Sequence, residues 1–169
     1  AIAPSRAVHI AQQICRAVGA AHEAGIIHRD LKSDNVMLVE RDKDPDFVKV
    51  LDFGICKVTD GAGGGSRTRP GIVMGSPDFM APEQAVGIDA SVASDVYALG
   101  TIVFHMVTGR VPFYGRNAID VLVQKGAKPA PRIRDIVPDL PAALDDVVAQ
   151  CLEREPNLRP ASMRDVEYQ

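Results

Sequence analysis

The spacing of apolar residues along the chain predicts a mainly helical protein. In residues 8–21 apolar side chains recur at helical intervals, with Ser5 as the expected N-cap and Gly25 as the expected left-handed residue at the end. Residues 91–109, "SVASDVYALGTIVFHMVTG", are apolar nearly all round. This pattern is typical of a central, buried helix, and Gly109 is expected to end it.

Shorter elements are predicted on both sides of this helix. Residues 36–39 and 47–51 read as two strands joined by the polar turn "ERDKDPD". Residues 59–75 are Gly-rich and polar, and we interpret them as a flexible loop. Three more helices are expected to begin at Asn117, Pro141 and Ser162, the first ending near Lys125 and the third capped with the help of Asp165.

Composition and charge narrow the class of protein. Of the 169 residues 46% are hydrophobic and 24% charged, as in ordinary globular domains, and no apolar run is long enough to span a membrane. The net charge of -3 gives no reason to expect nucleic acid as a partner. The three cysteines are odd in number and far apart, which favours reduced thiols in the cytoplasm over a disulfide framework or a zinc site.

One polar stretch lies between apolar runs and indicates an active site: "HRDLKSDN", residues 28–35. It is followed by "DFG" at 52–54 and "APE" at 81–83. In this order the three motifs resemble those of the protein kinase family. The string "APEQA" and the Ala-rich, Lys-poor chain are similar to bacterial serine/threonine kinases of the eukaryotic (Hanks) type.

The resemblance implies a kinase-like fold, which is α+β in the complete domain. It places a catalytic loop at 28–35, a metal-binding loop at 52–54 and an activation segment at 52–83. The chain contains no "GxGxxGxV" loop and no "VAIK" strand, which belong to the small lobe of such kinases. Residues 1–169 are therefore expected to form the C-terminal large lobe, with the N-terminal lobe absent.

The resemblance also assigns catalytic roles. Asp30 is expected to accept the proton of the substrate hydroxyl, and Lys32 to neutralise the γ-phosphate of ATP. Asn35 and Asp52 are expected to hold Mg²⁺, with Mn²⁺ as an alternative. The serine/threonine branch is indicated by Lys32 and by Ser76, whose hydroxyl is expected to bond Asp30 and Lys32.

Regulatory and structural roles follow from the same resemblance. Arg29 is expected to pair with a phosphate on the loop, for which Ser66 and Thr68 are the candidates, although any hydroxyl in such a loop is eligible. Asp95 is expected to accept hydrogen bonds from the backbone around His28 and Arg29, and Glu83 to pair with Arg159. The residues expected to have structural roles are His28, Phe53, Gly54, Glu83, Asp95 and Arg159.

Other kinds of site fit less well. His28 could be a general base, but the resemblance implies that it is a packing and hydrogen-bonding residue. The string "DKDPD" begins like a calcium loop, but the required Gly and Glu are replaced by Phe47 and Phe53. "GAGGGS" lacks the Lys-Ser/Thr that follows a phosphate-binding loop. Cys56 is either a reactive thiol near the nucleotide or an inert buried one, and both readings stay open.

Two functions therefore remain. In the first, the chain is part of an active kinase that phosphorylates Ser and Thr of protein substrates, while the fragment by itself is inactive. In the second, it is a lobe-only pseudokinase or scaffold that acts by binding proteins. The joint presence of Asp30, Lys32, Asn35 and Asp52 favours the first. The surface that a small lobe would cover, including Phe53, is expected to permit self-association. The expected location is the cytoplasm, and anchoring through segments outside this chain is left open.

Overall fold

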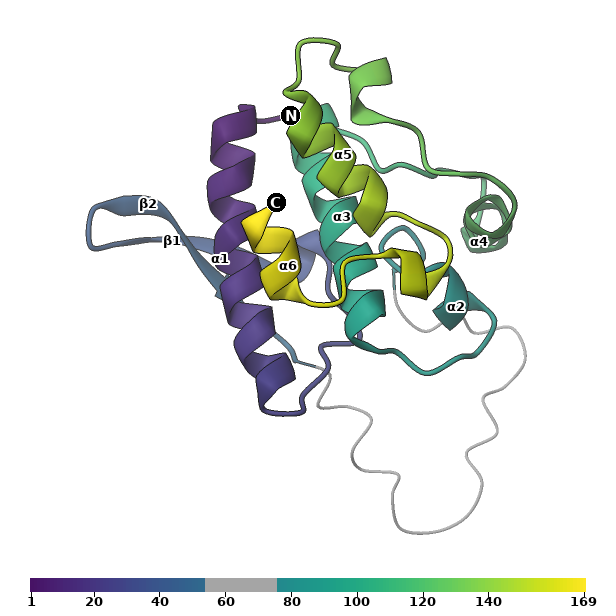
Figure 1. Cartoon of the computed structure of the whole chain (residues 1–169), viewed down its shortest axis with the longest axis horizontal. Coiled ribbons are helices and arrows are strands. Elements are labelled where there is room, and N and C mark those ends of the chain that lie inside the picture. Colours follow the sequence, from purple (N-terminus) through teal and green to yellow (C-terminus); the bar gives the residue numbers. More distant parts are fainter. Residues whose placement is uncertain (54–75) are drawn as a thin grey trace, which may run out of the picture.

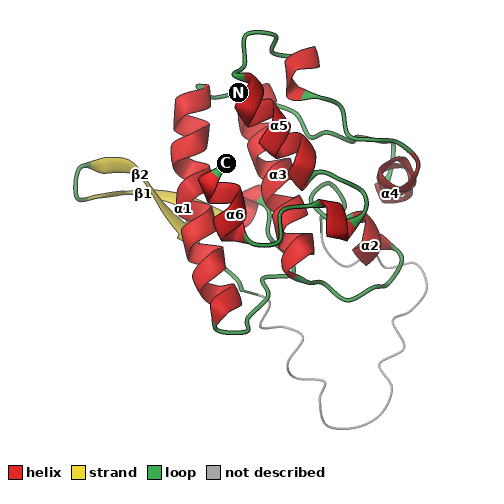
Figure 2. Ribbon diagram, in the orientation of Figure 1, coloured by secondary structure: helices red, strands yellow, loops and turns green. Residues whose placement is uncertain are grey.

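The computed structural model describes residues 1–53 and 76–169, and it shows a helical body with one β-hairpin at its side (Figures 1 and 2). This confirms the predicted fold class. Residues 59–75, predicted to be a loop, lie outside the described residues, as does Cys56. The helices are α1 (Pro4–Glu23), α2 (Pro82–Ala85), α3 (Val92–Thr108), α4 (Ala118–Ala127), α5 (Ala142–Cys151) and α6 (Met163–Tyr168). The strands are β1 (Val36–Arg41) and β2 (Asp44–Val50), and 3₁₀ turns form at Ser33–Asn35, Ile133–Asp135 and Pro156–Leu158.

Helix α3 lies at the centre of the body, with α1, α5 and α6 packed around it (Figure 1). All its residues from Ser94 to Phe104 are buried, because a helix without a polar face is stable only inside. Gly109, with φ of 77°, ends the helix as predicted. Gly100 lets α5 approach closely, since a Cβ placed on it would lie 2.7 Å from the Cβ of Cys151.

Helix α1 ends as predicted but begins differently. At its end, Gly25 has φ of 77°, its N–H donates to the carbonyl of His22, and the N–H of Ile26 donates to that of Ala21. This pair of bonds is a Schellman motif, for which glycine is the favoured residue. The prediction that Ser5 caps the start is wrong. The helix begins at Pro4, whose fixed φ suits the first helical position, and Ser5 lies inside the first turn.

The hairpin has a tighter turn than the sequence suggested. Asp42 and Lys43 have φ of 51° and 71°, as in a two-residue type I′ turn, so the strands run into the polar segment that was expected to be the turn. Strand β2 is fastened to α1 by Gln13, whose side chain accepts the N–H of Val48 at 2.9 Å and donates to the carbonyl of Asp46 at 2.9 Å.

The capping predictions for two C-terminal helices are confirmed. The side chain of Asn117 accepts the N–H of Asp120 at 2.9 Å, and that of Ser162 accepts the N–H of Asp165 at 3.1 Å. Each cap satisfies a backbone donor that has no partner within its own helix. Helix α4 runs two residues beyond the expected end, to Ala127.

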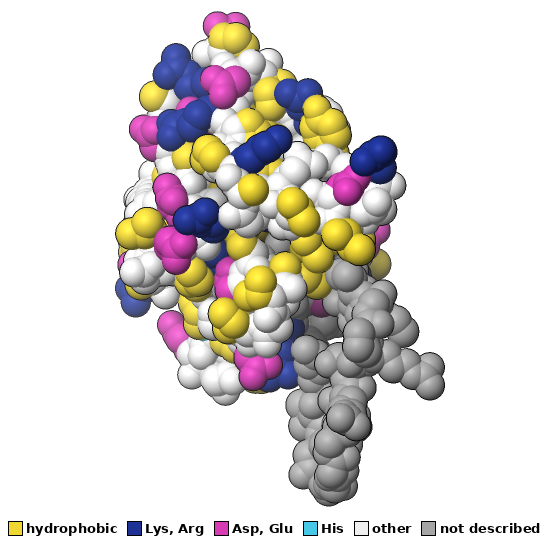
Figure 3. Space-filling view, turned by 90° about the vertical axis from the view of Figure 1, so that its right-hand side faces the viewer, with side chains coloured by type: hydrophobic (Ala, Val, Ile, Leu, Met, Phe, Trp, Pro, Cys, Tyr) yellow, Lys and Arg dark blue, Asp and Glu magenta, His cyan; other side chains and the backbone are white. Residues whose placement is uncertain are grey.

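The face that carries α2 and α4 mixes apolar and charged side chains. Val86 and Ile88 follow α2 and are exposed, as are Ile119 and Val123 on α4. Figure 3, turned toward this side, shows apolar side chains scattered among charged ones. Among the helices of residues 1–53 and 76–169, none is long and apolar enough to cross a membrane.

Candidate active site

The catalytic-loop stretch is held by the buried carboxylate of Asp95 on α3. Its Oδ2 accepts the N–H of His28 at 2.8 Å, and its Oδ1 accepts the N–H of Arg29 at 3.0 Å. Both contacts that the resemblance implied are therefore present. Arg29 has φ of 72°, a left-handed conformation that non-glycine residues seldom adopt. The two bonds thus fix a strained turn immediately before Asp30.

A third contact of Asp95, with His22 on α1, was missed by the sequence reasoning. The Nε2 of His22 lies 2.7 Å from Oδ2 of Asp95, and the two side chains are 8% and 2% exposed. A signal for it exists in the sequence. His22 follows Val18 by four residues on the buried face of α1, where a polar side chain requires a hydrogen-bond partner.

His28 connects the catalytic loop to the segment that begins at Asp52. Its side chain is fully buried, and Nε2 lies 3.0 Å from the carbonyl oxygen of Leu51, within hydrogen-bond distance. Its ring packs against Phe53 with centroids 4.7 Å apart. The imidazole of His28 thus packs against Phe53 and bonds the backbone at Leu51, which agrees with the structural role expected for it. Gly54 lies outside the described residues.

Asp30 and Lys32 form an ion pair that faces solvent. The Nζ of Lys32 donates to Oδ2 of Asp30 at 2.8 Å, and the side chains are 21% and 44% exposed. This hydrogen bond raises the pKa of Lys32, burial acts against it, and the carboxylates of Asp30, Asp34 and Asp52 raise it further. The ammonium of Lys32 therefore stays charged at neutral pH and faces the carboxylate of Asp30.

Asn35 and Asp52 offer the oxygen ligands expected for a divalent cation. Asn35 is 6% exposed, and its Nδ2 donates to the carbonyl of Asp30 at 2.8 Å, which commits the amide nitrogen and leaves Oδ1 as the atom for a ligand. Its own carbonyl accepts the N–H of Leu51 at 2.8 Å, so it is tied to the residue before Asp52. Asp52 has φ of 54° and lies close enough to raise the pKa of Lys32.

This donor set fits Mg²⁺. That ion usually takes one or two protein oxygens and completes its shell with water and substrate phosphates. Within residues 1–53 and 76–169, no group of three His, Cys, Asp or Glu side chains could hold a metal by itself. The arrangement therefore suits an ion shared with a phosphate better than a closed protein cage.

Ser76 does not make the contact that the resemblance implied, as far as the structure describes it, and the expected phosphate contact of Arg29 is not tested. Between the described residues no hydrogen bond joins the Ser76 hydroxyl to Asp30 or Lys32, which pair with each other instead. The side chain of Arg29 is exposed. Its expected partners, Ser66 and Thr68, lie outside the described residues, so the phosphate pairing stays a prediction.

Gln84 ties the end of the activation segment to the catalytic loop, a contact that the sequence reasoning also missed. Its Nε2 donates to the carbonyl of Arg29 at 3.2 Å. Its Oε1 accepts the N–H of Ala81 at 3.1 Å. The two ends of one amide thus join the start of α2 to the residue before Asp30.

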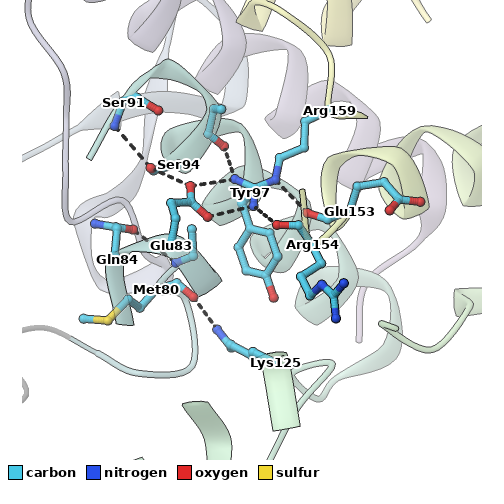
Figure 4. Close-up of polar contacts among 12 residues, drawn as sticks. Met80, Glu83, Gln84, Ser91, Ser94, Tyr97, Lys125, Glu153, Arg154 and Arg159 are labelled. Atoms are coloured by element: carbon cyan, nitrogen blue, oxygen red, sulfur yellow. Dashed lines mark hydrogen bonds and ion pairs between the residues drawn. The ribbon is translucent and has the colours of Figure 1, made fainter. Parts of the chain in front are cut away.

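Glu83 and Arg159 form the ion pair that the resemblance implied (Figure 4). Two hydrogen bonds of 2.8 Å join the guanidinium to the carboxylate, which also accepts the Ser94 hydroxyl at 2.8 Å. Burial by itself would raise the pKa of Glu83, but the hydrogen bonds from Arg159, from the backbone and from Ser94, together with the charge of Arg159, outweigh burial and lower the pKa. The guanidinium lies 4.9 Å from the centre of the Tyr97 ring.

Lys125 on α4 is buried near the same ring (Figure 4). It is 1% exposed, and its Nζ donates to the carbonyls of Asp78 at 2.6 Å and Met80 at 2.7 Å. Nζ lies 5.1 Å from the centre of the Tyr97 ring. Burial lowers the pKa of Lys125 to about 7, while the charge of Asp78 acts in the opposite direction. Nothing in the sequence pattern predicted this, since a lysine on a short helix is usually solvated.

Known proteins resemble the chain over almost its whole length. Residues 1–168 match the family described as the protein kinase domain. The serine/threonine-protein kinases Pkn1 and pkn3 of Myxococcus xanthus are each 41% identical to it, over 96% and 93% of the chain. PknA of Mycobacterium tuberculosis is 39% identical over 90% of the chain. The chain spans 23%, 29% and 33% of the length of these three relatives.

A solved structure shows the same likeness in three dimensions. The crystal structure of Rad53 1-466 in complex with AMP-PNP superposes with a TM-score of 0.75 and 26% sequence identity. The match covers 99% of this chain and 40% of that one. The described helices and hairpin are thus arranged as in part of a larger chain.

Proposed function

This chain belongs to the protein kinase family, and from that premise we propose that it is the catalytic large lobe of a protein serine/threonine kinase. The reaction is transfer of the γ-phosphate of ATP to Ser or Thr hydroxyls of protein substrates. The proposal is carried by one observation, the gathering of Asp30, Lys32, Asn35 and Asp52 around a single solvent-facing site. The names of the relatives and the nucleotide analogue bound to Rad53 support it.

In this mechanism the protein positions the reactants and neutralises charge, because phosphoryl transfer passes through a loose transition state. The exposed carboxylate of Asp30 orients the acceptor hydroxyl and takes its proton. The ammonium of Lys32, which lies beside Asp30, would offset the charge of the γ-phosphate during transfer. The strained turn at Arg29, fixed by Asp95, sets the direction in which Asp30 points.

We propose that Asn35 and Asp52 hold Mg²⁺, or Mn²⁺ in its place. The ion supplies positive charge to the phosphates of bound ATP. Asn35 is suited to the task because its Nδ2 is committed to the carbonyl of Asp30, which fixes the orientation of the amide. Its link to Leu51 keeps this amide beside Asp52.

We further propose that the nucleotide is covered by a small lobe outside these residues. The chain has no glycine-rich phosphate loop and spans a quarter to a third of its relatives. Three large apolar side chains near the catalytic loop are exposed. Ile26, before the loop, is 50% exposed, and Met37 and Leu38, after it, are 48% and 40% exposed. Such side chains suit a covered surface, and in the isolated chain they favour self-association.

The test uses the polypeptide as it is expressed in the cell, with radiolabelled ATP, Mg²⁺ and myelin basic protein as acceptor. We expect label on Ser and Thr, and a fall of at least roughly 100-fold for Asp30→Asn, which removes the proton acceptor. Asp42→Asn is the matched control, since that side chain is 90% exposed in the hairpin turn. Transfer that Asp30→Asn leaves intact would refute the proposal, and binding of proteins without any transfer would favour the scaffold alternative.

A further inference from the structure

Lys125 fastens a short segment of the chain, residues 76–80, to helix α4. This segment forms a turn in which the N–H groups of Phe79 and Met80 donate to the carbonyl of Ser76 at 3.1 and 3.3 Å. The carbonyls of Asp78 and Met80, in the same segment, accept hydrogen bonds from Nζ of Lys125. One ammonium thus fixes two of the peptide groups that define the turn.

The same segment is connected to the catalytic loop on its other side. Phe79 is 9% exposed, and its ring lies 6.3 Å from that of His105 on α3, centre to centre. The Nδ1 of His105 lies 3.4 Å from the hydroxyl of Ser33, in the catalytic loop. A few residues on, Gln84 donates to the carbonyl of Arg29. A displacement of residues 76–80 would therefore shift the backbone next to Asp30.

The free-energy cost of burying an amine indicates that Lys125 does more than hold α4 against the rest of the protein. A buried ammonium needs hydrogen bonds to offset the loss of water, whereas apolar side chains would hold α4 in place without this penalty. Among the charged groups nearby, Asp78 acts on it directly, and Glu83 and Arg159 lie across the Tyr97 ring. Its bonds go to backbone carbonyls rather than to a carboxylate, so they specify the path of the segment.

We propose that Lys125 is a positioning residue for the protein substrate. By holding residues 76–80 against α4, it shapes the surface on which the acceptor chain lies when its hydroxyl reaches Asp30. The inference rests on the proposed kinase function and adds a specificity determinant to it. It does not concern the nucleotide, because among the described residues the hydrogen bonds of Lys125 go to Asp78 and Met80 and none joins it to Lys32, Asn35 or Asp52.

The experiment measures KM for myelin basic protein and KM for ATP separately in the polypeptide as expressed in the cell. Lys125→Met keeps approximately the length of the side chain and removes its hydrogen-bond donors. We expect it to raise the acceptor KM roughly tenfold, because part of the free energy of the two lost hydrogen bonds is then lost from substrate binding. KM for ATP should stay within about twofold of wild type. Lys125→Gln, which keeps an N–H donor on a shorter arm, should lie between the two, and it carries the test if the methionine variant does not fold. Lys128→Met is the control, because that lysine is exposed at the end of α4.

Two outcomes separate this inference from the function on which it rests. An active wild type whose acceptor KM is unchanged in both Lys125 variants overturns the inference alone. If the wild type transfers no phosphate, the proposed function fails, and the role of Lys125 is then decided by hydrogen exchange in the 169-residue chain. Faster exchange at the amides of Phe79 and Met80 in Lys125→Met supports positioning of the segment, whereas faster exchange confined to α4 overturns it.

Discussion

Glu83 and Arg159 are 76 positions apart in the chain, yet their side chains meet in two hydrogen bonds of 2.8 Å inside the protein. The guanidinium is fully buried and also donates to three backbone carbonyls, those of Ala93, Glu153 and Arg154. The pair therefore joins α2 and the start of α3 to the loop that precedes α6. Removing either partner leaves a buried charge without its counter-ion.

The first prediction concerns this pair. Glu83→Gln and Arg159→Met should each lower the free energy of unfolding by about 3–5 kcal/mol, and the double variant should lose clearly less than the sum. Urea unfolding followed by circular dichroism measures all three. Arg16→Met is the control, because the Arg16–Glu167 pair is on the surface with Arg16 67% exposed, and we expect a loss below about 1 kcal/mol. Fully additive losses would show that the two charges act independently.

The second prediction concerns the carboxylate that holds the catalytic loop. Asp95→Asn replaces one acceptor oxygen by an NH₂ group, so the N–H groups of His28 and Arg29 can no longer both be satisfied. Hydrogen exchange at these two amides should become at least roughly tenfold faster, in line with the loss of one buried hydrogen bond. His9→Ala, at an exposed contact with Asp44 on the hairpin, should leave both amides unchanged. Equal exchange in Asp95→Asn and wild type would contradict the structure here.

The third prediction tests the close approach of α3 and α5. Gly100→Ala would bring a methyl group to 2.7 Å from the Cβ of Cys151 and 3.3 Å from Leu152, so the helices must move apart. We expect a loss of about 1–3 kcal/mol in the free energy of unfolding, as for an overpacked core. Gly126→Ala on α4, where a Cβ meets nothing within 4 Å, should instead stabilise the protein by about 0.5–1 kcal/mol. Thermal or urea unfolding distinguishes the two signs.

The fourth prediction concerns pH and Lys125. Its pKa is about 7 in the folded protein and 10.5 when unperturbed, so between these values the unfolded chain binds the additional proton. The free energy of unfolding should therefore rise with pH across this window, and the gain is lost as pH falls toward 7. Relative to Lys125→Met, wild type should gain up to about 1.4 kcal/mol per pH unit. Urea unfolding at several pH values between these limits measures it, and Lys128→Met should follow wild type. A pH-independent difference would show that the burial of Lys125 leaves its pKa unchanged.

The fifth prediction concerns the chain by itself. The purified 169-residue protein should show no Asp30-dependent transfer from radiolabelled ATP, because nothing in its sequence supplies a glycine-rich cover for the phosphates. It should also self-associate, since Met37 and Leu38 are about half exposed beside the site. Light scattering and a filter-binding assay test the two statements. A monodisperse monomer would overturn the prediction of self-association. Transfer that Asp30→Asn abolishes would overturn the prediction that the chain by itself is inactive.

The sequence determined the features whose causes are local. The apolar stripe of α1 and the all-apolar α3 follow from side-chain periodicity, and the caps at Asn117 and Ser162 follow from residues three positions apart. The same holds for the order of the polar motifs, from which the site residues Asp30, Asn35 and Asp52 were named. Where a local rule had two solutions the prediction failed, as at Pro4 and Ser5, because both residues suit the start of a helix.

The tertiary structure alone decided the distant contacts for which the sequence offered no motif. His22 reaches Asp95 across 73 positions, and Lys125 reaches Asp78 across 47. Lys125 is on a short helix, where a lysine is usually solvated, and His22 is on the apolar face of α1 but has no partner that the sequence identifies. Whether such a side chain is buried depends on which helix packs over it, and a buried polar group then takes whatever acceptor the packing brings within reach. The residues of the candidate site could therefore be named from the sequence. The contacts that no motif indicated, from His22 to Asp95, from Gln84 to Arg29 and from Lys125 to residues 76–80, depend on how α1, α2 and α4 pack and were identified only from the fold.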